Sequence, residues 1–163
     1  MEMATHKNMN MSRGHKKPYN KLLIMIVVSF IAMYILMYAM VNSIANAVPN
    51  INQFYMAGLM TTAMIIIEVA LMGDMYTNKK LNAIIMALSS VALIAFFFFI
   101  QYQTAVSDKQ FLKSMIPHHA SAILMSEKST TQDPEIKKLQ NDIISSQRKE
   151  IEQMKAKLKE LEK

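Results

Sequence analysis

Three long blocks of apolar residues dominate the hydrophobic pattern of the chain. They run from Leu22 to Val41, from Tyr55 to Met72 and from Ala83 to Ile100. Each block has about the 17–25 residues that a helix needs to cross a bilayer. Asp, Glu, Lys and Arg are absent from the first and third blocks, and the second contains a single acid, Glu68. The pattern therefore predicts three transmembrane helices, over about residues 22–44, 54–75 and 81–102.

Polar residues dominate again after the third block, with the spacing of soluble helices. One helix is expected over about Asp108 to Lys128. A second begins at Asp133-Pro134-Glu135, because Asp is a favourable N-cap, Pro fits the first turn and an acid complements the helix dipole. Its seam repeats every seven positions, as in a coiled coil. The seam residues are Ile144, Gln147, Ile151, Met154, Leu158 and Leu161.

A helical hairpin of about fifty residues has too little core to be stable alone. Its seam therefore needs a partner. One solution is a homodimer in which two hairpins form a four-helix bundle, and the other is docking onto the membrane domain of the same chain. The predicted fold is thus all-α, with a disordered basic tail at residues 1–21, a three-span membrane domain at 22–102 and an outer helical hairpin at 108–163.

Basic residues indicate how the spans are oriented. The loop between the first two blocks has none, whereas the loop after the second block carries Lys79 and Lys80. Positive segments tend to stay in the cytoplasm, so the N-terminus and the second loop are expected to face inward. The hairpin domain would then lie in the periplasm or outside the cell, as in a protein of the bacterial inner membrane. The five basic residues of the tail are Lys7, Arg13, Lys16, Lys17 and Lys21.

Composition narrows the expected partners. The formal net charge is +6, but seven basic residues are topology signals and the others mix with acids in the hairpin domain, so no nucleic-acid partner is required. The chain has no Cys, which excludes disulfides and Cys-ligated metal sites. Methionine is the unusual residue, at 17 of 163. The expected partners are membrane lipid, a metal ion and a second copy of the chain.

The segment Met115-Ile116-Pro117-His118-His119 is the sharpest candidate for chemistry. On a helix, Met115 and His119 share one face, His118 and Met125 share a neighbouring face, and Met154 could close the site from the second helix. Thioether and imidazole groups favour Cu(I), and imidazole also suits Cu(II) and zinc. Alternatively the Met residues fill the core and one His is a hydrogen-bonded core residue. Spacing decides neither this nor whether Pro117 bends a helix or begins one.

The same segment resembles a known family, the domain of unknown function number 305. The resemblance rests on Phe111 to Ile123, on the helix start at Asp133-Pro134-Glu135 and on Ile143 to Met154, and it spans about Lys109 to Leu161. It implies a ferritin-like helical fold. Some members of the family are periplasmic copper-binding proteins linked to copper tolerance. The resemblance therefore implies a bound copper ion, with these candidate ligands: Met115, His118, His119, Met125 and Met154.

Methionines also recur within the apolar blocks, every four residues in the second block and at similar spacing in the first. An acid inside a span is costly and is expected to face the bundle interior or water. These residues could form an intramembrane metal or proton site, made of Met33, Met37, Met60, Met64, Glu68 and Met72. The alternative is that Met packs the apolar interior and that a protonated Glu68 bonds Thr61, Thr62 or a neighbouring span.

The motifs of common catalytic sites are absent from the sequence, so we expect a protein that is not an enzyme. The predicted function is that of a membrane-anchored copper-binding protein, contributing to copper tolerance or delivery. Two alternatives remain open. One is a structural membrane protein with a dimerising outer bundle, and the other is copper transport along the Met and Glu68 residues of the spans.

Overall fold

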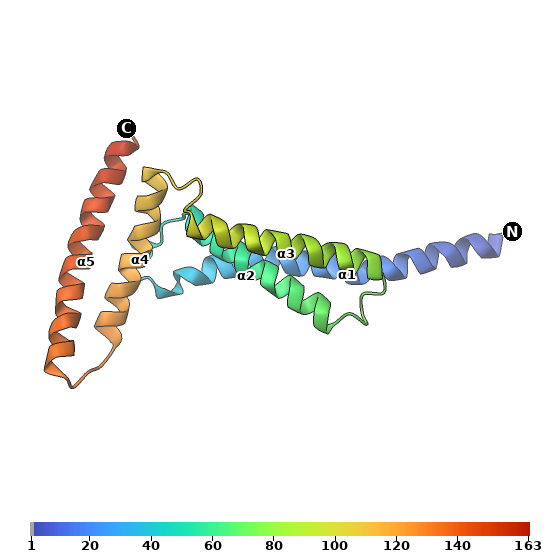
Figure 1. Ribbon diagram of the computed structural model, residues 1–163, viewed down its shortest axis with the longest axis horizontal. Coiled ribbons are helices and arrows are strands. Elements are labelled where there is room, and N and C mark those ends of the chain that lie inside the picture. Colours follow the sequence, from blue (N-terminus) through green and yellow to red (C-terminus); the bar gives the residue numbers. More distant parts are fainter. Residues whose placement is uncertain (1) are drawn as a thin grey trace. The chain divides into compact units, whose positions relative to one another are not determined.

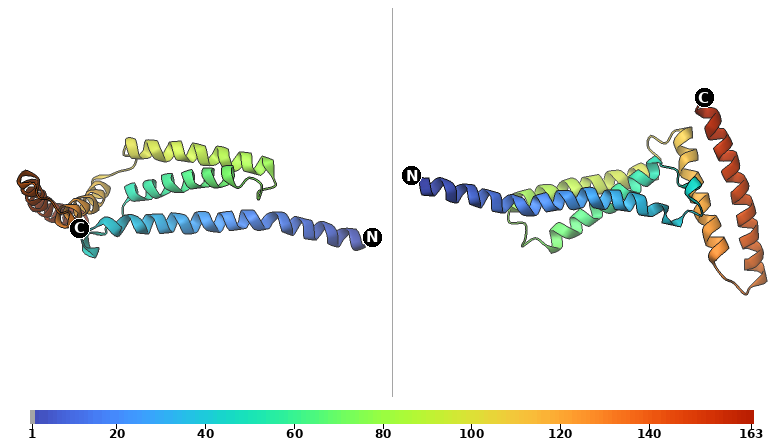
Figure 2. Two further views of the ribbon diagram at one scale, coloured as in Figure 1. Left: turned by 90° about the horizontal axis from the view of Figure 1, so that it is seen from below. Right: turned by 180° about the vertical axis from the view of Figure 1, so that it is seen from behind.

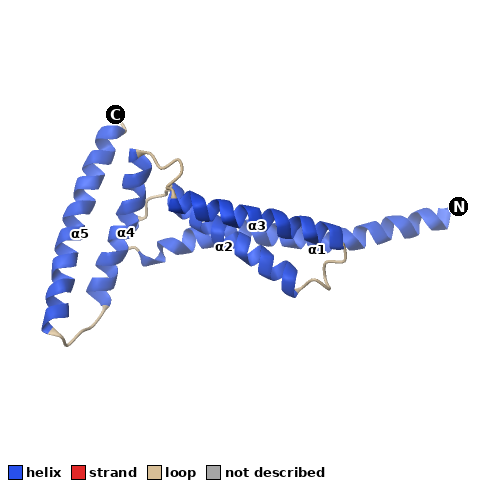
Figure 3. Ribbon diagram, viewed as in Figure 1, coloured by secondary structure: helices blue, strands red, loops and turns tan. Residues whose placement is uncertain are grey.

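The computed structural model describes the backbone of residues 2–163 and the side chains of residues 18–163. Within this part of the chain every regular element is a helix, which confirms the predicted all-α fold (Figure 3). Two short 3-10 turns, η1 and η2, follow the first helix (Figure 1). In chain order the elements are α1 (Glu2–Leu36), η1 (Met37–Met40), η2 (Ile44–Asn46), α2 (Ile51–Leu71), α3 (Lys79–Gln101), α4 (Asp108–Lys128) and α5 (Pro134–Leu161).

These elements form two compact units. The membrane unit consists of the chain up to Tyr34 together with Tyr55–Tyr102. The hairpin unit consists of Ile35–Phe54 together with Gln103–Lys163. The segment between α1 and α2 therefore belongs mainly to the hairpin unit, although the sequence predicted it to be a simple loop between two spans.

Three helices are long and apolar enough to cross a membrane, as the hydrophobic blocks predict. The spans cover Pro18–Met40, Ile51–Leu71 and Lys79–Gln101. The first helix differs from the prediction at its start, because α1 begins at Glu2 where a disordered tail to residue 21 was expected. Met and Lys, which are frequent in this tail, are good helix formers, so the helix of the first span can continue into it. The side chains of residues 1–17 lie outside the described part.

The core of the membrane unit joins its three helices and the α2–α3 loop. Leu22, Ile65, Val69 and Tyr76 are buried together. Elsewhere in the unit α2 and α3 meet closely at Gly58, where an added Cβ would lie 2.5 Å from the ring of Phe96. Small residues permit such close approach of helices in membranes, where packing rather than the hydrophobic effect holds helices together.

The core of the hairpin unit lies along α4 and α5, which run side by side (Figure 2). Ser107 caps α4 by accepting from the Gln110 N–H, and Asp133 caps α5 by accepting from the Glu135 and Ile136 N–H groups. The buried core residues are Ile116, Ala120, Ile123 and Ile151, and partly buried Val41, Val48, Met154 and Leu158 pack against them. The predicted seam of α5 therefore faces α4, and two valines of the segment between α1 and α2 extend this core. Because the seam is covered within the hairpin unit, it does not by itself require a second copy of the chain.

Polar side chains also fasten the α1–α2 segment to the hairpin. The Asn50 carboxamide oxygen accepts from the Ser114 hydroxyl at 3.3 Å, and the Ile51 N–H donates to the Gln110 side chain at 3.0 Å. The Asn46 carboxamide oxygen accepts from the Lys155 ammonium. Asn46 and Asn50 are 7% and 6% exposed, so these bonds satisfy polar groups that would be costly to bury alone. This accounts for the many asparagines of the segment.

Because α3 is one of the three helices that are long and apolar enough to span a membrane, we predict that the chain crosses the membrane between the α2–α3 loop and α4. The chain has no natural cysteine, so single cysteines can be placed at exposed Asp74, in the α2–α3 loop, and at exposed Thr130, after α4. In intact cells an impermeant maleimide should label the Thr130→Cys protein, and the Asp74→Cys protein should react only after permeabilisation. The cysteine-free protein is the control. Equal labelling of both variants from outside would contradict the predicted crossing.

Candidate functional site

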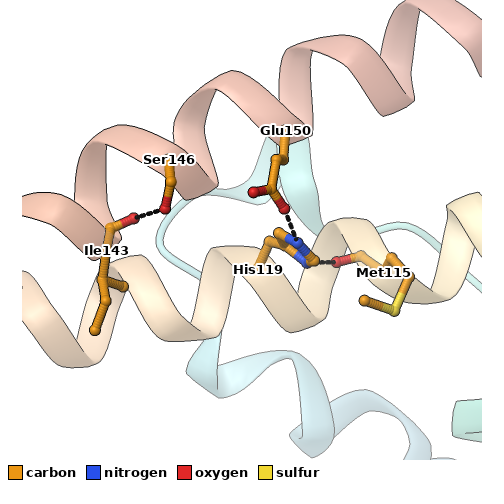
Figure 4. A network of polar contacts seen from close by, with 5 residues as sticks. All are labelled: Met115, His119, Ile143, Ser146 and Glu150. Atoms are coloured by element: carbon orange, nitrogen blue, oxygen red, sulfur yellow. Dashed lines mark hydrogen bonds and ion pairs between the residues drawn. The ribbon is translucent and has the colours of Figure 1, made fainter.

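The two adjacent histidines of α4 lie in different surroundings. His119 is 8% exposed, its Nδ1 lies 2.9 Å from the Met115 carbonyl oxygen, and its Nε2 lies 2.7 Å from a Glu150 carboxylate oxygen (Figure 4). His118 is exposed, and its ring centroid is 6.1 Å from that of His119. Successive residues of a helix point about 100° apart, so burial of one histidine against α5 turns the other outward.

Both partners of the His119 ring are hydrogen-bond acceptors. The backbone carbonyl can only accept, so Nδ1 must carry a proton and donate it. The Nε2 atom is in turn paired with the Glu150 side chain. Both ring nitrogens are therefore engaged within the hairpin. The sequence left open whether His119 is a metal ligand or a hydrogen-bonded core residue. Its geometry is that of a hydrogen-bonded core residue.

Glu150 was not among the residues singled out from the sequence. A buried histidine needs a partner for each ring nitrogen, and Glu150 directly precedes the buried seam residue Ile151, so its proximity to α4 could have been inferred. The pairing with His119, however, depends on the register of α4 against α5. Periodicity gives the faces of two helices but not their relative shift.

The other predicted hairpin ligands are divided between the surface and the core. Met125 is 53% exposed and Met115 is half-buried, with its side chain directed away from Glu150 (Figure 4). Met154 packs against the core cluster of Ile116, Ala120 and Ile123. Pro117 is buried inside α4, so it does not begin a helix. The five predicted ligands therefore do not converge on one point within a single chain.

Exposed and soft residues instead share one face of α4. Starting from Phe111, they follow at steps of four, three, four and three residues. At about 100° per residue these positions span an arc of about 80°, opposite the buried face with Ile116, Ala120 and Ile123. We call this face the soft stripe. Its members are Phe111, Met115, His118, Ala122 and Met125.

The predicted intramembrane residues are similarly divided. Met64 packs against the core of the membrane unit, and the sulfur of Met33 accepts from the Thr61 hydroxyl at 3.6 Å. Met60 and Met72 are 43% and 41% exposed. Met37 belongs to η1 in the hairpin unit. The regular spacing of these methionines thus does not produce one continuous interior row.

Glu68 lies in the last turn of α2. It accepts a hydrogen bond of 3.1 Å from the hydroxyl of Tyr76, in the α2–α3 loop. Burial and this bond raise the pKa of Tyr76, so the phenol remains a donor. The predicted partners Thr61 and Thr62 bond other groups, so the hydrogen bond that holds Glu68 comes from a residue that the sequence analysis did not consider.

A polar pocket of about 230 Å³ also lies in the hairpin unit, beside Asn46 and Ile151. It is lined by Arg148 and Lys155, but each of these cations already has a partner. Arg148 pairs with Glu127 at 2.6 Å, and Lys155 donates to Asn46. Among the described residues, no group of three His, Cys, Asp or Glu side chains could hold a metal.

A family model described as Domain of unknown function (DUF305) matches residues 52–158. These 107 positions (158 − 51) are about two thirds of the 163 residues. The chain belongs to this family. The match begins in α2, so the family region includes two spans and is wider than the hairpin resemblance in the sequence.

The chain is also similar to the "Uncharacterized protein L153" of Acanthamoeba polyphaga mimivirus. The two sequences are 40% identical over 113 residues, which cover 68% of this chain and 72% of the relative. No solved structure matches the chain.

The contact between His119 and Glu150 predicts a difference between two neighbouring acids of α5. Glu150→Ala should lower the free energy of unfolding by about 1 kcal/mol, because it leaves a buried ring nitrogen without its partner while the acid itself is half-exposed. The melting temperature of the purified protein should then fall by roughly 2–4 °C. Circular dichroism during heating would measure this.

Glu152→Ala is the matched control, since Glu152 is exposed on the same helix and the change removes the same groups. It should leave the melting temperature nearly unchanged. Equal effects of the two substitutions would contradict a specific role for the His119–Glu150 contact.

Proposed function

We propose that this protein is a membrane-anchored metal-binding protein that takes copper, as Cu(I), on the soft stripe of α4. The observation that carries the proposal is the exposed imidazole of His118 beside the thioether of Met115, on a face without formal charge. Thioether and neutral imidazole are ligands that suit Cu(I). Membership of the DUF305 family and the three apolar helices support the coarser part, a helical protein associated with a membrane.

The proposal narrows the ligand set inferred from the sequence. We leave His119 out of the proposed ligand set, because both of its ring nitrogens are engaged. Met154 is assigned to core packing, on the basis of its contacts. Met125 is seven residues from His118, about 10.5 Å along the helix, and is therefore farther from His118 than Met115 is. Met115 and His118, about 4.5 Å apart along the axis, remain as the ligand pair.

The membrane anchor and its charged loops also indicate on which side of the membrane this site would lie. The absence of basic residues between α1 and α2, together with Lys79 and Lys80 between α2 and α3, supports an orientation with the hairpin unit outside the cytoplasm. In that position the protein would bind copper on the outer side of the membrane that anchors it, for tolerance or for delivery to another protein. We propose binding without catalysis, since the hairpin unit offers no activated nucleophile beside a base among the contacts described.

Transport through the spans is a less well supported function. Met60 and Met72 are among the more exposed methionines of the membrane unit, while Met33 and Met64 are packed or bonded. Glu68 already accepts from Tyr76. A purely structural role for the hairpin is the other alternative, and metal binding by the intact protein separates it from the proposal.

The proposal predicts that metal affinity depends on the soft stripe. His118→Gln and Met115→Leu each remove a direct ligand. Loss of a residue that only supports a ligand already lowers metal affinity by roughly 10–100-fold, so each substitution should weaken Cu(I) binding by at least that factor. Leu replaces Met at similar volume without sulfur, so folding is preserved. Competition with a chromophoric Cu(I) chelator, on the full chain in detergent, measures the affinity.

Met154→Leu is the matched control, because it makes the same chemical change at a packed position. It should leave the affinity unchanged. Unaltered Cu(I) affinity in the His118→Gln protein, or an equal loss in the Met154→Leu protein, would remove the support for this site.

A further inference from the structure

The soft stripe differs from the rest of α4 in its charge. All five charged residues of the helix lie off the stripe, near its two ends or toward α5: Asp108, Lys109, Lys113, Glu127 and Lys128. Two of these already pair within the hairpin, Lys113 with Glu162 at 3.5 Å and Glu127 with Arg148 at 2.6 Å. Phe111 and Met125, at the two ends of the stripe, are each 53% exposed. A second apolar, uncharged face, opposite the buried core face of the helix, is typical of an interaction surface.

The order of residues in the stripe is self-complementary about His118. Phe111 lies seven residues before His118 and Met125 lies seven after it, while Met115 lies three before and Ala122 four after. If a second α4 is placed antiparallel, with the two-fold axis at His118, Phe111 meets Met125 of the second copy. Met115 then meets Ala122 of the second copy. Each contact joins a large residue to a smaller or more flexible one, and a thioether against an aromatic ring is favourable.

We propose that two copies of this chain associate through their soft stripes, antiparallel about His118, and that the shared surface completes the copper site. This rests on the proposed function for the metal, but the pairing of the two helices does not. Such an interface is isologous, since the same patch serves on both copies. It differs from the bundle expected from the α5 seam, because that seam is used within the hairpin.

The pairing supplies the ligands that one chain lacks. At the axis the two His118 rings face each other, and the two Met115 residues lie about 4.5 Å along the axis on either side of them. Two imidazoles and two thioethers then surround one position. One chain offers only half of this set, so the stoichiometry expected is one Cu(I) per two chains.

Charges near the ends of the stripe are compatible with the same register. At the level of Asp108 the second copy presents Lys128, and the reverse holds at the level of Lys128, while Lys109 and Glu127 lie on the side of the helix turned away from the stripe. No like charges therefore oppose each other at these levels, and the two helix dipoles run antiparallel, which is favourable. A parallel pairing would instead bring Asp108 to Asp108 and Lys128 to Lys128.

Cysteine crosslinking tests the register, because the chain has no natural cysteine. In the full-length protein, Phe111→Cys together with Met125→Cys should give a disulfide-linked dimer under mild oxidation. Either substitution alone should give little, because the two equivalent positions lie about 21 Å apart along the axis in an antiparallel pair. Efficient crosslinking of the single variants would overturn the antiparallel register.

A charge in the stripe tests whether the surface is needed for metal binding. Ala122→Glu places two acids in the interface and should convert the dimer to a monomer in sedimentation with matched detergent, with loss of the Cu(I) bound between chains. Ala156→Glu is the matched control, on an exposed position of α5, and should leave both unchanged. Both properties are measured on the full chain with Cu(I) alone.

The outcomes separate the two proposals. A wild-type monomer that binds one Cu(I) per chain through His118 would overturn the paired site while leaving the proposed function intact. A wild-type dimer that Ala122→Glu dissociates but that binds no Cu(I) would support the interface and remove the proposed function. A dimer unaffected by Ala122→Glu would overturn the interface.

Discussion

Packing of Ile116, Ala120 and Ile123 against Ile151 fixes the rotation of α4 about its own axis. That rotation decides which side chains of α4 face the core and which face solvent. With these residues inward, His119 lies at the edge of the core within reach of Glu150, and His118 is turned to solvent. A rotation of about 100° would exchange the two histidines, but it would also expose two fully buried isoleucines. Burying an isoleucine stabilises a fold by about 1.5–3 kcal/mol, so the core decides which histidine is accessible.

The hairpin obtains its remaining core from a segment distant in sequence. Val41 and Val48 pack beside the α4–α5 seam, and the asparagines around them bond Ser114 and Lys155. A connection between two spans is thereby part of a folded unit. This explains how a helical pair with so small a core can be ordered, and why the connection contains asparagine rather than apolar residues alone. Carboxamides can both donate and accept, so they satisfy polar groups within a partly buried loop.

Features set by local pattern could be predicted from the sequence. The three spans, both helices of the hairpin, the cap at Asp133 and the seam through Ile151 all follow from periodicity and end signals. What could not be predicted depended on contacts between segments far apart in the chain. The partner of His119 is 31 residues away, and the partner of Lys155 is 109 residues away. The Met spacing in the spans was regular, yet Met60 and Met64 differ in exposure, because neighbouring helices rather than spacing decide which side is covered.

Because only one of the two histidines is buried, the contacts of His119 also help to fix the position of exposed His118. Pro117 has no N–H, so α4 lacks one backbone bond in the turn that precedes His118. In that region the His119 ring bonds the Met115 carbonyl, and Glu150 holds the ring from α5. The backbone that carries Met115 and His118 is thus tied to the core from its buried side. A face held in this way keeps Met115 and His118 at a fixed separation, which is the condition that a shared site between two copies requires.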